Sequence, residues 1–167
     1  SVTGVQTCAL PIYMNFITEQ VQGNVQADNI SVQSLLAMAN LQNKYSADLT
    51  GTFNGSISLS GDYRNPNAHL TGEIKDGHLK KYPLQEISID ASYENGIISI
   101  NKFYGQQNEG KIAAQGTWDI NGPINMELST QNIGTDLLTE LIDYNIDAKG
   151  TANAYAKISG TSDKPQA

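Results

Sequence analysis

Two histidines are the side chains in this sequence best suited to bind a metal ion or to transfer protons near neutral pH. His69 and His78 are nine residues apart. Zinc ligands come in closer pairs, such as two cysteines or two histidines with only two to five residues between them. The spacing therefore predicts no metal site and no other cofactor, and we expect both histidines to lie on the surface.

The serines and the acidic residues show no catalytic arrangement either. Ser60 and Ser159 each precede a glycine, but neither has the surrounding pattern of a nucleophile elbow. There is also no glycine-rich phosphate-binding loop. No two of the scattered aspartates are placed for acid–base chemistry, and these are Asp76, Asp90, Asp119, Asp143 and Asp147. We therefore expect that the protein is not an enzyme.

The charge of the chain argues against binding to nucleic acid. It has 17 acidic and 10 basic residues and a net charge of −7. A nucleic-acid-binding protein needs clustered lysine and arginine to replace the counterions of the phosphates. Charged residues make up only 16% of the chain, and small polar residues are abundant, which is typical of an exported β protein.

The first thirteen residues differ from the rest of the chain. They have neither the basic start and apolar core of a signal peptide nor the roughly 20 apolar residues of a membrane span. Residues 2–12 read in order as a translated short-read sequencing adapter. We therefore expect residues 1–13 to be a non-native leader, and the lone Cys8 in it to say nothing about redox compartment. We also expect the native region, 14–167, to be truncated at both ends.

Alternating apolar and polar residues predict β-strands through most of this region. The longest apolar stripe takes every second residue from Ile112 to Ile120. A weaker strand is predicted over 17–25, where Glu19 interrupts the apolar side. Other stripes begin at Phe53, Leu70, Ile87, Ile124 and Ala152.

Turn-forming residues separate these strands. Asp76-Gly77, Asn95-Gly96 and Asn121-Gly122 are dipeptides that accept the positive φ angles of tight hairpins. Residues 105–110 are predicted to form a longer polar loop. Consecutive hairpins predict an antiparallel meander with one apolar and one polar face.

Two segments have helical periodicity instead. Apolar residues recur at i, i+3, i+4 and i+7 in 32–39 and with similar spacing in 137–142. Ser31 and Thr135 precede them as predicted N-caps. The chain is therefore predicted to be all-β with two short amphipathic helices.

The two helices belong to an internal repeat. Asn29-Ile30 precedes the first helix and Asn132-Ile133 the second, and eight of 21 residues are identical between 48–68 and 147–167. The identical residues include Asn54, which matches Asn153. This pattern predicts one repeat over about 29–131 and a second that begins at about residue 132.

The run Ser60-Gly61, Pro66, Ala68, Leu70, Gly72 resembles the repeats of the translocation and assembly module (TamB) and AsmA-like family. In that family a strand ends in glycine, a short linker leads to proline, and an alternating strand follows. Lys111-Ile112 with Gly116, and the Leu-Leu pairs of the two helical segments, also fit the pattern. The resemblance covers roughly residues 15–167.

This resemblance implies a curved antiparallel meander sheet that forms an open groove, a β-taco, with an apolar inner face. It implies a cell-envelope protein that carries phospholipid between the inner and outer membranes of a diderm bacterium, assists outer-membrane protein assembly, or does both. The location would be the periplasm, with the full-length protein anchored in the inner membrane. The partners would be phospholipid acyl chains and an outer-membrane β-barrel assembly protein.

The inward apolar residues are the candidate lipid-binding site, since burying each methylene of an acyl chain stabilises by about 0.8 kcal/mol. An ordinary sealed sandwich core needs the same alternation, so a structural or adhesive surface β-repeat protein is the alternative. The pair Lys80-Lys81 has two interpretations as well, a contact for anionic headgroups or a solvated turn. The candidate groove residues are Ile57, Leu59, Leu70, Ile74, Ile87, Ile89, Ile98, Ile100, Ile112, Trp118, Met126, Leu128 and Ile158.

Overall fold

The computed structural model describes residues 13–15, 17–38, 49–141, 149–161 and 164–166. They form a ten-stranded antiparallel sheet and two short helices. The elements are β1 (Tyr13–Asn15), β2 (Gln20–Ser31), α1 (Val32–Met38), β3 (Leu49–Asp62), β4 (Asn67–Leu79), β5 (Tyr82–Glu94), β6 (Ile97–Gln107), β7 (Gly110–Asp119), β8 (Ile124–Gly134), α3 (Thr135–Leu141), β9 (Thr151–Thr161) and β10 (Lys164–Gln166).

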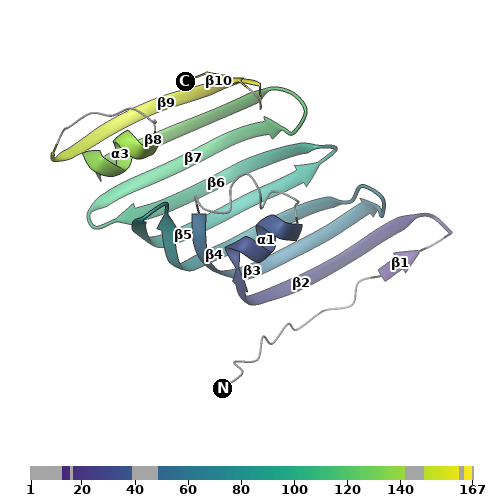
Figure 1. The fold of residues 1–167 in the computed structure, drawn as a ribbon. Coiled ribbons are helices and arrows are strands. Elements are labelled where there is room, and N and C mark those ends of the chain that lie inside the picture. Colours follow the sequence, from purple (N-terminus) through teal and green to yellow (C-terminus); the bar gives the residue numbers. More distant parts are fainter. Residues whose placement is uncertain (1–12, 16, 39–48, 142–148, 162–163, 167) are drawn as a thin grey trace.

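The strands lie across the sheet in their chain order, so the topology is a simple meander. Among the described residues, β1 pairs only with β2 and β10 only with β9, so the sheet does not close. The sheet is curved, and α1 and α3 lie near the same end of the strands (Figure 1). The predicted fold class, an all-β curved meander with two short helices, is confirmed.

Helix α1 begins where the sequence predicts it. The Ser31 hydroxyl accepts a hydrogen bond from the Ser34 backbone N–H at 3.1 Å, as an N-cap does. Thr135 lies inside α3 rather than before it, and its backbone N–H donates to the Gly150 carbonyl at 3.0 Å. Both helices follow a strand directly, and each packs on the strand before it and the strand after it.

The strand–helix–strand unit occurs twice with the same local geometry. The Asn54 side-chain oxygen accepts the backbone N–H of Asn29 at 3.0 Å, and that of Asn153 accepts the N–H of Asn132 at 2.7 Å. Both Asn29 and Asn132 have positive φ, 55° and 52°, at a shift of strand register. The predicted bounds of the repeats stay a prediction, but β2–α1–β3 and β8–α3–β9 are built alike.

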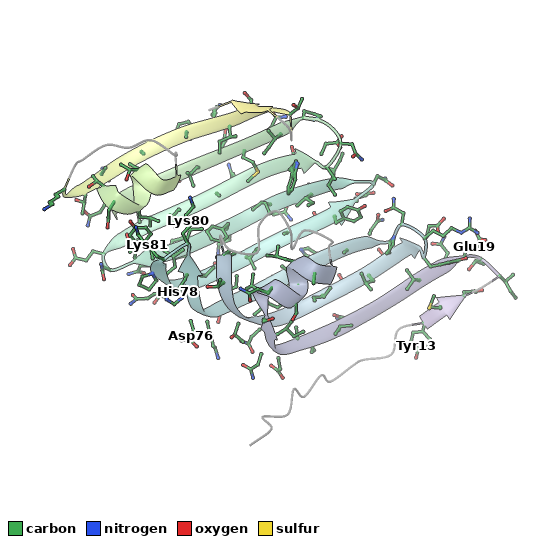
Figure 2. The ribbon with its side chains drawn as sticks, viewed as in Figure 1. Tyr13, Glu19, Asp76, His78, Lys80 and Lys81 are labelled. Atoms are coloured by element: carbon green, nitrogen blue, oxygen red, sulfur yellow. The ribbon has the colours of Figure 1, made fainter. Side chains whose placement is uncertain are left out.

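One predicted turn is wrong in position. Asp76-Gly77 lies inside β4, where Asp76 has a φ of 50°, and the chain turns at Lys80-Lys81 instead. Figure 2 shows these side chains gathered at the helix end of the sheet. A residue with positive φ serves a strand irregularity as readily as a hairpin turn, so the dipeptide alone did not distinguish the two.

The predicted loop over 105–110 is also mostly strand. β6 continues to Gln107, and a two-residue turn at Asn108-Glu109 leads into β7. Gly105 is buried on the apolar face, where a Cβ would lie 3.2 Å from the Ile112 side chain. Glycine here leaves room for packing rather than marking a loop.

The predicted strand over 17–25 begins later, at Gln20. Ile17 is 95% exposed, and Glu19 lies between β1 and β2 with a φ of 54°. The Glu19 carboxylate pairs with Arg64 at the turn end of the sheet, the end opposite the helices (Figure 2). Glu19 therefore does not interrupt the apolar face. Tyr13, the last residue of the predicted leader, lies in β1, and residues 1–12 are outside the described part of the chain.

Candidate functional site: an apolar sheet face

Cross-strand pairing aligns the inward side chains into rows that cross the sheet from β2 to β9. The central row consists of Val25, Ile57, Leu70, Ala91, Ile100, Gly116, Met126 and Ile158. The helix-side row, two residues nearer the helices, consists of Ala27, Gly55, Gly72, Ile89, Phe103, Ala114, Leu128 and Ala156. Neither row contains a charged or polar side chain.

A third row, the turn-side row, lies two residues further from the helices than the central row does. It consists of Gly23, Leu59, Ala68, Tyr93, Ile98, Trp118 and Ile124. At about 4.8 Å between strands, the central row is roughly 34 Å long, and the three rows span about 14 Å along the strands. All thirteen predicted groove residues lie on this one face.

The helices close the apolar face at one end. Val32 of α1 and Leu137 of α3 are 5% and 0% exposed and belong to one core cluster with Phe53. Three predicted groove residues are buried in the same cluster, namely Ile74, Ile87 and Ile112, at 5%, 1% and 2% exposure. These three therefore pack in a sealed core in this conformation and have little surface for a ligand.

The other ten predicted residues have intermediate exposure and lie in the three rows beyond the core. Among the described elements, α1 and α3 make most of their contacts with the strands that flank them. Ile57 and Leu70 of the central row pack against the core cluster, but no residue of the turn-side row does. The face therefore has a sealed helix end and an uncovered remainder. Whether an acyl chain occupies the remainder stays a prediction.

Phe103 is an inward residue that the sequence did not predict. On β6 it stands three residues after Ile100, so strict alternation places it on the polar face. The register shifts between Ile100 and Phe103, and Phe103 pairs with Ile89 and Ala114 in the helix-side row. An irregularity of this kind has no sequence signal here apart from the size of the aromatic side chain.

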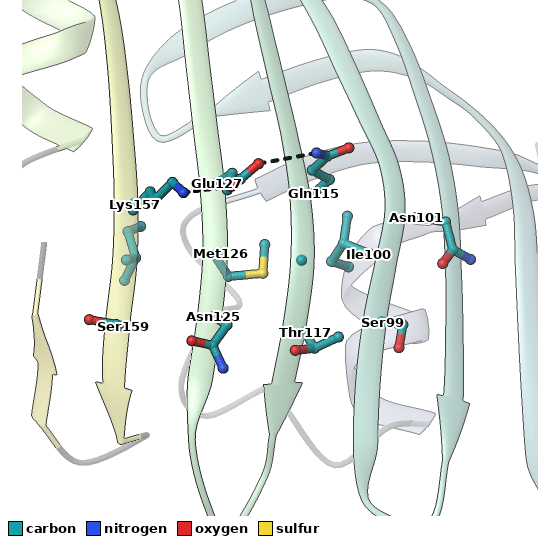
Figure 3. A pocket seen from close by; sticks show the side chains of 12 residues that line it. Ser99, Ile100, Asn101, Gln115, Thr117, Asn125, Met126, Glu127, Lys157 and Ser159 are labelled. Carbon is teal, nitrogen blue, oxygen red and sulfur yellow. Dashed lines mark hydrogen bonds and ion pairs between the residues drawn. The ribbon is translucent and has the colours of Figure 1, made fainter.

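The opposite, outer face is polar. Over β6–β9 the sheet has an open hollow of about 680 Å³, which is lined by outward residues and also by Ile100, Gly116, Met126 and Ile158 of the central row. Figure 3 shows the side chains that line it. A second hollow of about 920 Å³ lies near the turn between β4 and β5, where His78 is one of the lining residues. Outward side chains around the first hollow are Ser99, Asn101, Gln115, Thr117, Asn125, Glu127, Lys157 and Ser159.

A small charge cluster crosses the first hollow. Gln115 Nε2 donates to Glu127 Oε2 at 3.2 Å, and Lys157 Nζ lies 3.4 Å from Glu127 Oε1. These contacts, the Gln115 hydrogen bond first and those of Tyr155 and Lys157 after it, lower the pKa of Glu127. Glu127 in turn raises the pKa of Lys157.

We predict that Gln115→Ala raises the pKa of Glu127 toward its ordinary value, because the largest contact that favours the ionised carboxylate is lost. A lowered carboxyl pKa stabilises the fold above the unfolded-chain pKa, and this stability is lost as the pH falls through the folded value. The effect on stability should be small, since the Glu127 side chain is 40% exposed. A carboxyl-carbon NMR titration measures the midpoint, and an unchanged midpoint in Gln115→Ala would contradict the assignment.

His69 lies on the same outer face. Its Nε2 is 2.9 Å from Asp90 Oδ1, which also accepts a hydrogen bond from Asn101 at 2.8 Å. The Asn101 bond, and then His69, lower the pKa of Asp90. The His69 side chain is 48% exposed, as expected for a surface histidine. Within the described residues, no three His, Cys, Asp or Glu side chains lie close enough together to hold a metal ion.

The lysine pair forms the turn between β4 and β5, with Lys80 at a φ of 54°. Lys81 Nζ lies 5.2 Å from the centre of the Tyr82 ring, a distance at which a cation is attracted to an aromatic face. Lys81 is exposed, Lys80 is half-buried, and both lie in the turn. Contact with anionic headgroups stays a prediction.

Comparison with protein-family models, curated proteins and solved structures finds no match to this chain. No helix among the described residues has the length and apolar character to cross a membrane.

Proposed function

We propose that the chain carries phospholipid acyl chains along the uncovered part of its apolar face, as part of a cell-envelope protein that links the inner and outer membranes. The observation that carries the proposal is the central row, which crosses eight strands without a polar side chain and lies mostly outside the core cluster under the helices. The membranes, the periplasmic location and a role in outer-membrane protein assembly come from the TamB and AsmA-like resemblance.

The dimensions of the face suit an acyl chain. The central row, about 34 Å long, exceeds the depth of one leaflet, roughly half of a 30 Å hydrocarbon core. Each methylene that leaves water on this face contributes about 0.8 kcal/mol. A tail that lies along the central row would contact one strand after another, so it could slide with little change in free energy.

The proposal also orients the lipid. Because α1 and α3 seal the helix end, the headgroup would lie at the turn end, beyond the turn-side row. Polar side chains stand there, among them Asn65, which accepts a hydrogen bond from the Tyr93 hydroxyl at 3.1 Å. The headgroup would then stay in water while the tail covers the apolar rows.

Met126→Asp should lower the affinity for a fluorescent phospholipid at least about tenfold, because a carboxylate in the central row has no partner under an acyl chain. Asn125→Asp is the matched control, since it places the same charge one residue away on the exposed outer face. Binding to the full chain is measured by fluorescence, and circular dichroism checks that both variants are folded.

Equal binding by both variants and the unchanged protein would contradict the proposal. If none of the three proteins bound the phospholipid measurably, that would also contradict the proposal. Either outcome would favour the alternative function, a structural or adhesive β-repeat whose apolar face is sealed by another part of the protein.

A further inference from the structure

The edge of β9 that faces away from β8 is largely unpaired. Only Ser159–Thr161 pair with β10 there, and no other described strand meets that edge. The Ala154 N–H points toward β8, where it donates to the Thr130 hydroxyl at 3.1 Å. Because successive N–H and C=O groups of a strand point to opposite sides, those of Asn153, Tyr155 and Lys157 face the free edge.

β3 shows what such an edge binds. β3 and β9 occupy the same place in the two strand–helix–strand units, and Asn54 and Asn153 make the same hydrogen bond to a backbone N–H at the preceding register shift. The edge of β3 that corresponds to the free edge of β9 is filled by β4. There, Asn54, Ser56 and Ser58 pair with Glu73, Thr71 and His69.

The first residues of β10 repeat the start of β4. Gln166 pairs with Ser159, just as Asn67 pairs with Ser60 one repeat earlier. A proline, Pro165 or Pro66, precedes the paired residue in each case. The register that β4 uses on β3 is therefore already set at the turn end of β9.

The inward side chains of β9 are small and leave room beside them. Ala152, Ala154 and Ala156 stand where β3 has Phe53, Gly55 and Ile57. In the β3–β4 register, a strand like β4 would bring its Ile74 position beside Ala152 and its Leu70 position beside Ala156. The large side chains of one strand would then lie next to the small ones of the other.

We propose that the free edge of β9 is a strand-binding site for an antiparallel strand of the β4 type. Such a strand has leucine, glycine and isoleucine at alternating inward positions and polar residues between them. It pairs its Glu73, Thr71 and His69 positions with Asn153, Tyr155 and Lys157 and extends the apolar face by one strand. Affinity would come from main-chain hydrogen bonds, and specificity from the alternating side chains.

An 11-residue peptide with the sequence of residues 69–79, which leaves out the positions that β10 already occupies on β9, tests this site. When the peptide is added to the full chain, the Asn153, Tyr155 and Lys157 amides should exchange with deuterium at least about tenfold more slowly, as measured by NMR. The Asn24 and Gln26 amides, at the opposite free edge on β2, should keep their exchange rates.

Two N-methylated peptides provide the matched control. The N–H of Thr71 faces β3 in the β3–β4 register, so methylation there should abolish protection of β9. The N–H of Leu70 faces the other way, so methylation there should leave protection intact. A peptide with His69→Glu should bind more tightly than the parent, because it places a carboxylate opposite Lys157.

Three results would overturn the proposal. The first is protection of the β2 edge or of no edge at all, and the second is equal behaviour of the two methylated peptides. The third is protection of the same β9 amides that grows with protein concentration in the absence of peptide, because the site would then belong to a second copy of this chain.

Discussion

Phe53→Ala should lower the free energy of unfolding by about 3–5 kcal/mol, the usual cost of removing a fully buried aromatic side chain. Phe53 is 0% exposed and lies in the core cluster with Val32 of α1 and Leu137 of α3. Its ring also lies against the backbone at Gly55 and Gly72. Truncation therefore leaves a cavity at the point where the sheet and the helices meet.

Urea unfolding of the full chain measures this loss. Ser58→Ala is the control, because Ser58 lies on the polar face of the same strand and its loss should change stability by no more than about 0.5 kcal/mol. A loss below about 1 kcal/mol in Phe53→Ala would mean that the helix end is not a packed core. The division of the apolar face into sealed and uncovered parts would then fail.

Gly72→Ala is expected to destabilise the protein by about 3 kcal/mol, the upper end of the range for overpacking. A Cβ at Gly72 would overlap the Asn54 carbonyl oxygen and lie 2.8 Å from both the Gly55 Cα and the Phe53 ring. Two of these three atoms belong to the backbone of β3, so neither can turn aside as a side chain would.

Gly105→Ala is the matched substitution on the same face. A Cβ there would meet only side-chain atoms, at 3.2 Å from Ile112 and 3.4 Å from Leu84. It should therefore cost clearly less than Gly72→Ala in the same urea experiment. Equal losses would show that the close approach of β3 and β4 at Gly55 and Gly72 is not what requires glycine.

Period-two alternation predicted the sheet and its apolar face because apolar residues occupy every second position along most of each strand. Residues 112–118, for example, keep one parity throughout β7 and pair without a shift against β8. The Asn95-Gly96 turn is confirmed as well, with Glu94 paired to Ile97. These features are local, so neighbouring residues contain enough information to specify them.

The irregularities in the strands were not predictable in the same way. Asp76 adopts a positive φ inside β4, and Phe103 changes face after a register shift in β6. Each depends on how neighbouring strands pair, which is a property of the sheet rather than of one strand. The burial of each apolar side chain was not predictable from the sequence either, because Ile112 and Met126 both lie in stripes of alternating apolar residues. Only the packing of the helix end seals Ile112.

The repeat was visible as identical residues, but its physical basis came from the structure. Asn54 and Asn153 are identical in sequence because each accepts the backbone N–H of the asparagine that bends the preceding strand. That bend directs the chain into α1 or α3. A side chain on the polar face thus helps to position the helices that close the apolar face.

Site-specific photocrosslinking to phospholipid is the most direct test of the central claim, that the uncovered rows hold acyl chains. Probes at Ile98, Ile100 and Met126, expressed in the periplasm of a diderm host, should form phospholipid adducts. Probes at the buried Ile112 and at the outward Gln115 should form none. Adducts at Gln115 as frequent as at Ile100, or no adducts at the three inward positions, would contradict the claim.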